Sequence, residues 1–245
     1  MKESGSNRHL DLEWRGASDR MLARLKTEYQ LNTVLLEGGT ELTQLVRLRD
    51  WVHSRFRHHS TNFPAEFDSL YILEQAKRGE RYRCVEYAFL LADVYRAMGW
   101  PARLVRLEGE RGAHVVTEVY SSGFAKWILM DGQHATHVLR NKVPVSVYEF
   151  QQAVLLSRNS LSPQQVEEKL DYVEWNTGYL RYLMYPQDMS YGKQLATLIV
   201  LAPPGDAGPK TKPAYLLEHG TEYIITCDPK VVYPADVLSV GSVSE

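Results

Sequence analysis

One stretch, residues 81–107, constrains the fold more than any other part of the chain. Its first half, CVEYAFLLADVYRAM, is apolar on most sides at helical spacing, which predicts a buried helix from about Cys84 to Met98. Gly99 is the expected C-cap, and Pro101 prevents the helix from continuing. The next segment, ARLVRLE, has the composition of a β-strand. This switch predicts a central helix packed on a sheet.

The segments on either side predict further helices and strands. TELTQLVRLRDWVHSRF indicates a helix capped by Thr40, and FDSLYILEQAKRG a helix that ends at Gly79. ARLVRLE, HVVTEVY and KWILMD, separated by GERG and SSGF, predict three antiparallel strands. SVYE has capping-box spacing and predicts a helix from Ser146 to about Ser157, and SPQQVEEKLDYVEW a helix with Pro163 in its first turn. LATLIVLA and TEYIITC predict strands, so the chain belongs to the α+β class.

Charge and hydropathy exclude several classes of function. The formal net charge of −2 argues against nucleic acid as a partner. No run of about 18 apolar residues is present, so we expect no membrane span. The polar start, MKESGSNRHLDLEWRG, favours a cytoplasmic protein, with an exported protein trimmed of its leader as the alternative. We interpret one local basic run as a solvated helix face: Arg47, Arg49, Arg55, Arg57, His58 and His59.

Cys84 is one of only two cysteines and lies in the first turn of the expected central helix. A polar stripe of Glu86, Asp93 and Arg96 lies on the other side of this helix, so Cys84 points inward. The free N–H groups of a first turn stabilise a thiolate and lower its pKa, and Arg81 and Arg83 nearby could add to this effect if they fold toward the sulfur. A buried cysteine is more often inert packing, so a nucleophile requires a base and a group that orients the base.

The two strands that follow supply such a pair. If Tyr120 pairs with Ala125 across a four-residue loop, the same register places His114 directly opposite Asp131. Opposite residues of an antiparallel pair project from the same face, with Cβ atoms roughly 5 Å apart. Asp131 can then hold one ring nitrogen of His114 and leave the other facing Cys84. These residues form a candidate nucleophile, base and orienting group.

These motifs together resemble the core of the transglutaminase-like superfamily, whose relatives include papain-type cysteine peptidases, microbial peptidases and peptide N-glycanases. The resemblance covers roughly residues 40–135 and rests on Cys84 at a helix start, GWPARLV, HVVTEVY and KWILMD. It implies an α+β, papain-like core in which a central Cys-bearing helix packs on a small antiparallel sheet. Residues 1–145 would form this core, and residues 146–245 a helical and β extension packed on it as one globular unit.

The resemblance also implies an activity. A triad of Cys84, His114 and Asp131 would cleave amide bonds of peptides or proteins through a thioester, without a cofactor or metal. Hydrolysis by a peptidase, amidase or deamidase is favoured over cross-linking, and the sequence is silent on the oligomeric state. One alternative is an impaired binding or scaffold module, because Tyr82 stands where the family usually has glycine. Another is a separate ligand-binding domain after residue 145.

The oxyanion hole and the substrate-binding residues are less constrained by the sequence. The backbone N–H of Cys84 is a natural oxyanion donor at a helix start. A second donor is expected upstream, around Trp51 or Tyr82, and Arg83 is a further candidate for binding substrate. The family often carries HAW on the His strand, whereas Val115 and Val116 follow His114 here.

Other histidines, aromatic residues and the second cysteine admit other roles. A metal site built from His114, Asp131, His134 and His137 is possible, but a turn after a strand more often carries surface histidines. His134 is an alternative base, and we interpret Cys227 as a packing residue. Four aromatic residues are expected to fill the core, with the wall of a substrate groove as the alternative: Trp175, Tyr179, Tyr182 and Tyr185.

Overall fold

The computed structural model describes residues 17–35, 37–156, 160–165, 170–186, 197–209 and 222–233. Helices are α1 (Asp19–Glu28), α2 (Glu41–His53), α3 (Ser69–Lys77), α4 (Cys84–Ala97), α5 (Val147–Leu156) and α6 (Tyr172–Asn176), with 3₁₀ turns η1 (Leu31–Val34), η3 (Thr177–Tyr179) and η4 (Pro229–Val231). Strands are β1 (Ala102–Gly109), β2 (Gly112–Ser121), β3 (Lys126–Met130), β4 (Thr136–Arg140), β5 (Val143–Pro144), β6 (Leu161–Gln165), β7 (Tyr182–Pro186), β8 (Thr197–Leu201) and β9 (Glu222–Thr226). The mixture of helices and mainly antiparallel sheets confirms the α+β class.

The main sheet is larger than the sequence predicts. Its six strands have the order β3-β2-β1-β7-β8-β9, and only the β8–β9 pair is parallel. A second sheet of three strands has the order β5-β4-β6. Because β7 pairs with β1, strands from both sides of residue 145 lie in one sheet.

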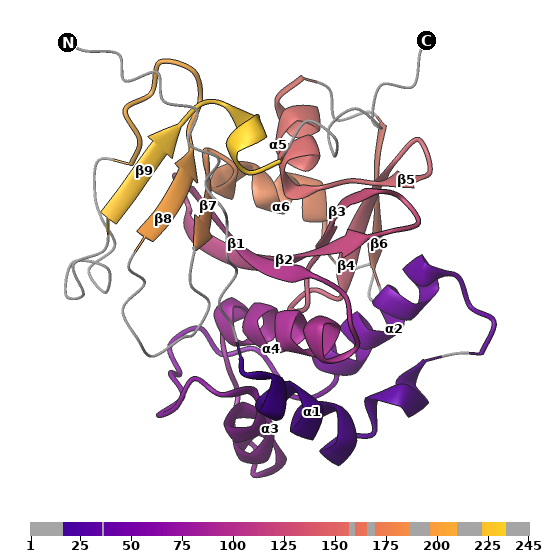
Figure 1. Cartoon of the computed structure of the whole chain (residues 1–245). Coiled ribbons are helices and arrows are strands. Elements are labelled where there is room, and N and C mark those ends of the chain that lie inside the picture. The colour runs from indigo at the N-terminus through magenta and orange to yellow at the C-terminus, as the bar shows by residue number, and fades with distance from the viewer. Residues whose placement is uncertain are drawn as a thin grey trace.

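The main sheet lies between two layers of helices (Figure 1). Helix α4 lies against one face, with α1, α2 and α3 packed around it, and α5 and α6 lie on the other side. Successive side chains along each strand point to opposite faces of the sheet, as expected from the pleat. Leu104, Val115 and Ile128 join the core around α4, whereas Val105 and Val116 join the core beneath α5 and α6. Helix α4 is therefore buried between the other helices and the sheet.

Side-chain caps explain why the helices begin where the sequence predicts. Thr40 Oγ1 accepts a hydrogen bond from the N–H of Thr43 at the start of α2. Ser146 and Glu149 form the reciprocal bonds of a capping box at the start of α5. Gly99 follows α4 with a φ of +94°, a conformation that glycine adopts without steric cost. These three helix boundaries are fixed by local chemistry.

The segment around Pro163 corrects one prediction, because Leu161–Gln165 is strand β6 rather than the start of a helix. It pairs with β4, and Pro163 lies opposite Val138. Since β6 is an edge strand, the missing N–H of proline costs no ladder hydrogen bond on the outer side. Only Tyr172–Asn176 of the predicted helix is helical, and residues 166–169 lie outside the described residues.

The polar stripe of α4 is itself largely buried. Glu86 and Asp93 are at most 1% exposed. Asp93 accepts a hydrogen bond from Ser69 on α3, and Glu86 binds Arg83 at the helix start. Burial raises the pKa of Asp93 to about 6, although Ser69 and Arg96 oppose this shift.

Within the described part of the chain, no helix combines the length and apolarity that a membrane crossing requires.

Candidate active site

Cys84 is the first residue of α4 and lies where that helix meets the main sheet. The residue before it, Arg83, is the N-cap, and its backbone N–H donates to Glu86 Oε2 at 2.9 Å. The side chain of Arg83 also pairs with Glu86, and its guanidinium lies 3.6 Å from the centre of the Phe63 ring. The charge of Arg83 is therefore compensated by Glu86. Cys84 enters the site from a helix start that is fixed by a capping box.

Strands β2 and β3 bring His114 and Asp131 together, although in a different register from the predicted one. Ser121 pairs with Lys126 across a four-residue loop, so Val116 rather than His114 faces the position of Asp131. The shift is by two residues, which leaves both side chains on the predicted face. They meet diagonally, and His114 Nε2 lies 2.7 Å from Asp131 Oδ2.

Three groups hold the buried carboxylate of Asp131. Its Oδ2 contacts His114 Nε2 and accepts a hydrogen bond from the hydroxyl of Tyr172 at 2.9 Å. Its Oδ1 accepts the backbone N–H of His134 at 3.0 Å. Burial disfavours the carboxylate, but the charge and hydrogen bond of His114 and the His134 N–H outweigh this effect and lower the pKa of Asp131. Asp131 is therefore anionic at neutral pH.

The other nitrogen of the His114 ring is available to Cys84, because Nε2 is held by Asp131. The Cys84 thiol lies within interaction range of the His114 side chain and of the backbone N–H of Val115. Burial raises the pKa of the thiol, but these two partners more than compensate and lower it below the ordinary value. Burial alone would lower the pKa of His114, whereas Asp131 and Cys84 raise it to about 10. The arrangement favours a thiolate beside an imidazolium.

An aromatic wall from α6 and η3 covers this site. The Trp175 ring contacts the His114 ring edge-to-face, with centroids 4.9 Å apart, and the His134 ring at 4.6 Å. Tyr179 packs against Trp175 at 4.8 Å. Tyr182 and Tyr185, the other members of the predicted aromatic group, are buried in β7. The group is thus divided between the core and a wall beside His114.

The three other candidate site residues are each engaged with other partners. Tyr82 is only 1% exposed, its ring packs on Phe56, and its backbone N–H donates to Arg57. The backbone N–H and the side chain of Arg83 are both engaged with Glu86. Trp51, which lies on α2, packs on the ring of Tyr29. The backbone N–H of Tyr82 and that of Arg83 are therefore not available as oxyanion donors.

The histidines after β3 do not form the four-residue metal set considered from the sequence. His137 is buried and lies 2.8 Å from Arg49 Nη1, on the far side of this turn. The potential ligand atoms of His114, Asp131 and His134 lie within 4.8 Å of one another. However, the facing atoms of His114 and Asp131 are in direct hydrogen-bond contact, and Tyr172 donates to the same oxygen. A metal ion does not fit this arrangement unless it displaces those hydrogen bonds.

The basic run of residues 47–59 is not one solvated helix face. Helix α2 ends at His53, and the buried Arg49 contacts Asp50 and His137. The segment that follows the helix lies beside Tyr82. The backbone N–H of His59 donates to the Tyr82 carbonyl at 2.7 Å. This pairing places His58 within electrostatic range of His134 and His114.

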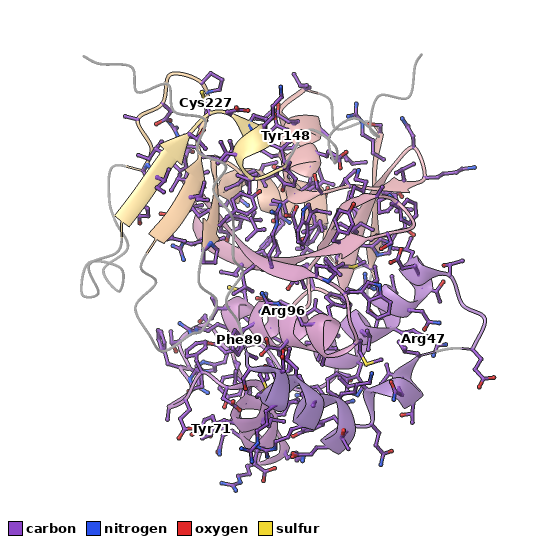
Figure 2. All side chains as sticks on the ribbon, in the orientation of Figure 1. Arg47, Tyr71, Phe89, Arg96, Tyr148 and Cys227 are labelled. Carbon is purple, nitrogen blue, oxygen red and sulfur yellow. The ribbon has the colours of Figure 1, made fainter. Side chains whose placement is uncertain are left out.

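Cys227 is distant from this site. It follows β9 and is exposed, which corrects its interpretation as a packing residue. Figure 2 shows Cys227 beside β9, well separated from Phe89 and Arg96 on α4. The protein thus carries one thiol beside His114 and one exposed thiol.

Comparison with known proteins agrees with this geometry. Residues 31–132 match the family model of the transglutaminase-like superfamily. The matched segment is similar to a transglutaminase-like core and spans less than half of the chain. No curated protein matches the chain.

Several solved structures resemble the chain at low identity. A candidate cysteine protease from Cytophaga hutchinsonii is 15% identical with a TM-score of 0.40, and the match covers 53% of this chain and 43% of that protein. A protein described as a TGase is 16% identical with a TM-score of 0.35, over 46% of this chain and 31% of the other. Calcium-bound LapG from Legionella pneumophila is 13% identical with a TM-score of 0.36, over 65% and 96%. This chain thus spans less than half the length of the first of these proteins.

Tyr172 is the site residue that the sequence analysis misses. It lies 41 positions after Asp131, in a helix that the sequence predicts only in part. Its hydroxyl reaches Asp131 only through the tertiary packing of α6. No periodicity within one element encodes such a contact, so no local signal could have identified it.

Proposed function

We propose that the protein is a thiol-dependent acyl-transfer enzyme that acts on amide bonds of peptides or proteins. Cys84 is the nucleophile, His114 the general base and acid, and Asp131 the group that orients His114. The observation that carries this proposal is the continuous series of contacts from Asp131 to His114 and from His114 to Cys84. Three buried or half-buried groups in this order have the roles that covalent catalysis requires.

The reaction follows from the positions of the three groups. The Cys84 thiolate attacks the amide carbonyl carbon, and a carbon–sulfur bond forms in a tetrahedral intermediate. The carbon–nitrogen bond then breaks as the His114 imidazolium gives its proton to the leaving amine. His114 next removes a proton from water, which attacks the thioester and releases the acid and the Cys84 thiol. Asp131 remains ionised and stabilises the imidazolium at each stage.

The backbone N–H of Cys84 is our candidate for the first oxyanion donor. It belongs to the first turn of α4, where backbone N–H groups have no partner within the helix. The positive end of the α4 dipole points in the same direction and favours a developing oxyanion.

We infer that water, rather than a lysine amine, resolves the thioester. The sequence carries no recognisable calcium-binding loop, which is more typical of the hydrolytic members of the family it resembles. The alternative of an inactive module drew its support from Tyr82. Since the Tyr82 ring packs against Phe56 in the core, it does not occupy the approach to Cys84.

Isotope labelling of the products tests this proposal. The protein is incubated with a mixed peptide library in H₂¹⁸O that also contains the amine dansylcadaverine, with Cys84→Ser as the matched control. Hydrolysis places ¹⁸O in new carboxylates, whereas transamidation places the dansyl group on the acyl product. We expect ¹⁸O incorporation that requires Cys84. Dansyl incorporation alone would contradict the preference for hydrolysis, and the absence of both with a range of folded and unfolded proteins would contradict the enzyme activity.

A further inference from the structure

Tyr172 lies outside the segment that matches the transglutaminase-like core, yet its hydroxyl contacts the centre of the candidate site. It donates a 2.9 Å hydrogen bond to Asp131 Oδ2, the same oxygen that faces His114 Nε2. The side chain is 1% exposed, so water does not replace this donor. We propose that Tyr172 is a positioning residue that sets the proton affinity of His114 through Asp131. This inference rests on the proposed function.

The segment that carries Tyr172 is held firmly against the core. The side chain of Asn176 is fully buried and donates to the Tyr172 carbonyl at 2.8 Å. The Tyr172 ring stacks on Phe150 of α5, with centroids 6.0 Å apart. Asp171 caps α6 by accepting the N–H of Glu174. The backbone and ring of Tyr172 are therefore held in place by α5 and α6, with the hydroxyl directed at Asp131.

A close backbone approach fixes the end of this segment on the β1–β2 hairpin. A Cβ at Gly109 would lie 2.3 Å from the carbonyl oxygen of Gly178, so only glycine permits this contact. The same carbonyl accepts the N–H of Arg111 at 3.1 Å. These contacts hold Trp175 and Tyr179 over His114 as well as Tyr172 beneath Asp131.

The effect of the Tyr172 hydroxyl on His114 has a definite sign. A donor to Oδ2 withdraws negative charge from the oxygen that binds His114 Nε2, so Asp131 holds the imidazolium proton less strongly. Removal of the hydroxyl leaves a more basic carboxylate and raises the pKa of His114. The ion pair of Cys84 and His114 then persists to higher pH. A catalytic cycle that must release this proton at each turnover is slowed.

The reaction of Cys84 with iodoacetate tests the inference. This anionic reagent is attracted by the imidazolium, so the rate rises as the thiol ionises and falls as His114 loses its proton. In Tyr172→Phe we expect the alkaline limb to move up by about half a pH unit to one unit, the equivalent of one hydrogen bond. Tyr95→Phe is the matched control, because it removes a buried hydroxyl that donates to Leu45 on α2 instead. Its profile should coincide with that of the wild type.

The outcomes separate this inference from the proposed function. A bell-shaped wild-type profile with an unmoved alkaline limb in Tyr172→Phe would overturn the role of Tyr172 and leave the proposed function intact. A wild-type profile without a low-pH limb for Cys84 would contradict the proposed function itself. A second measurement needs no variant: the Tyr172 hydroxyl proton should exchange slowly and show a nuclear Overhauser effect to the ring N–H of His114. The absence of that contact at low temperature would also overturn the inference.

Discussion

Asp131 connects three separate segments of the candidate site. Its two oxygens bind the ring of His114, the hydroxyl of Tyr172 and the backbone of His134. These partners come from β2, α6 and the turn after β3, so three separate segments are ordered by one carboxylate. A buried carboxylate with this many donors remains charged, and its charge is what makes the His114 imidazolium stable.

Replacement of Asp131 by asparagine tests this role at the scale of one residue. Asparagine keeps the shape but removes the charge, and its amide can donate to Nε2 and leave the proton of His114 on the wrong nitrogen. We expect turnover to fall on the order of 10³–10⁴-fold, as for loss of the orienting acid in other triads. Alkylation of Cys84 by iodoacetamide at pH 6 should slow at least tenfold.

Asp93→Asn is the control for this change, since Asp93 is a second buried carboxylate, on α4, that binds Ser69. In the Asp93→Asn variant, Cys84 should react with iodoacetamide at the wild-type rate. Equal slowing in both variants would mean that loss of any buried carboxylate disturbs α4, and that Asp131 has no specific role.

The sequence predicts some of these residue contacts and not others, for physical reasons. The face of the sheet on which a β2 or β3 side chain lies depends on whether the loop between the strands has an even number of residues. This is a local property, so His114 and Asp131 are correctly predicted on one face even though the register differs by two residues. The contact of Tyr172 with Asp131 depends on how α6 packs, which no local pattern reports. Tyr82 shows that a sequence signal can also mislead. The sequence suggests that this bulky residue narrows access to Cys84, but its ring is buried in the core.

At the scale of elements, the start of α4 determines where the thiol lies. Glu86 is fully buried, accepts the backbone N–H of Arg83, and neutralises the Arg83 side chain. Beyond this turn, the buried stretch of α4 packs between the other helices and the sheet. Glu86 therefore joins the cap of the helix to the position of Cys84.

We expect Glu86→Ala to weaken this helix start. The change removes a cap acceptor and leaves Arg83 without its buried partner, which should lower the free energy of unfolding by roughly 2–4 kcal/mol. Glu86→Gln keeps an acceptor for the Arg83 N–H and should lose less. Urea denaturation followed by circular dichroism measures both. A loss below about 0.5 kcal/mol in Glu86→Ala would contradict a structural role for this capping box.

The elements that the sequence predicts well are those with local start and stop signals. Helices α2, α3, α4 and α5 have side-chain caps or a terminal glycine, and strands β1–β3 have clear turns between them. Strands β4, β5 and β7 are missed because they are short or are buried on both faces, so alternation is absent. The segment of Pro163 is wrongly predicted because a helix-start signal there is overridden by pairing with β4.

At the scale of the whole molecule, the main sheet joins the two parts of the chain. Strand β7 pairs with β1, and the buried Arg103 of β1 binds Glu118 of β2 and the Val232 carbonyl near the end of the described residues. Arg103 also lies over the rings of Trp127, Tyr185 and Tyr233. A domain boundary near residue 145 would therefore divide one continuous sheet.

We expect limited proteolysis between residues 140 and 165 to leave the protein as one unit. The exposed turn at Asn141 and Lys142 offers a cleavage site, but the pairing of β1 with β7 should keep the fragments together until urea is added. Gel filtration of the nicked protein measures this. Two separate fragments that each unfold cooperatively would instead favour an independent ligand-binding domain after residue 145.

The ion pair of His114 and Asp131 should also shape the pH dependence of stability. The pKa of His114 is raised to about 10, so its contribution is complete below pH 6.5 and is lost as the pH rises toward 10. The pKa of Asp131 is lowered from 3.8, so its contribution is complete above about pH 4 and is lost on further acidification. The difference in unfolding free energy between wild type and His114→Gln should thus be largest between about pH 4 and 6.5. A difference that grows from pH 7 to 10 would contradict the raised pKa.

If His114 holds Cys84 as a thiolate, the alkylation rate of Cys84 must depend on pH in a way that an ordinary thiol does not show. Iodoacetamide labelling from pH 4 to 9, resolved by mass spectrometry, reports Cys84 and the exposed Cys227 in the same sample. We predict that the rate at Cys84 reaches half its maximum well below pH 8.5, the ordinary thiol pKa, and that His114→Ala abolishes this early rise. A Cys84 rate that rises only near pH 8.5, or one that His114→Ala leaves unchanged, would contradict the account.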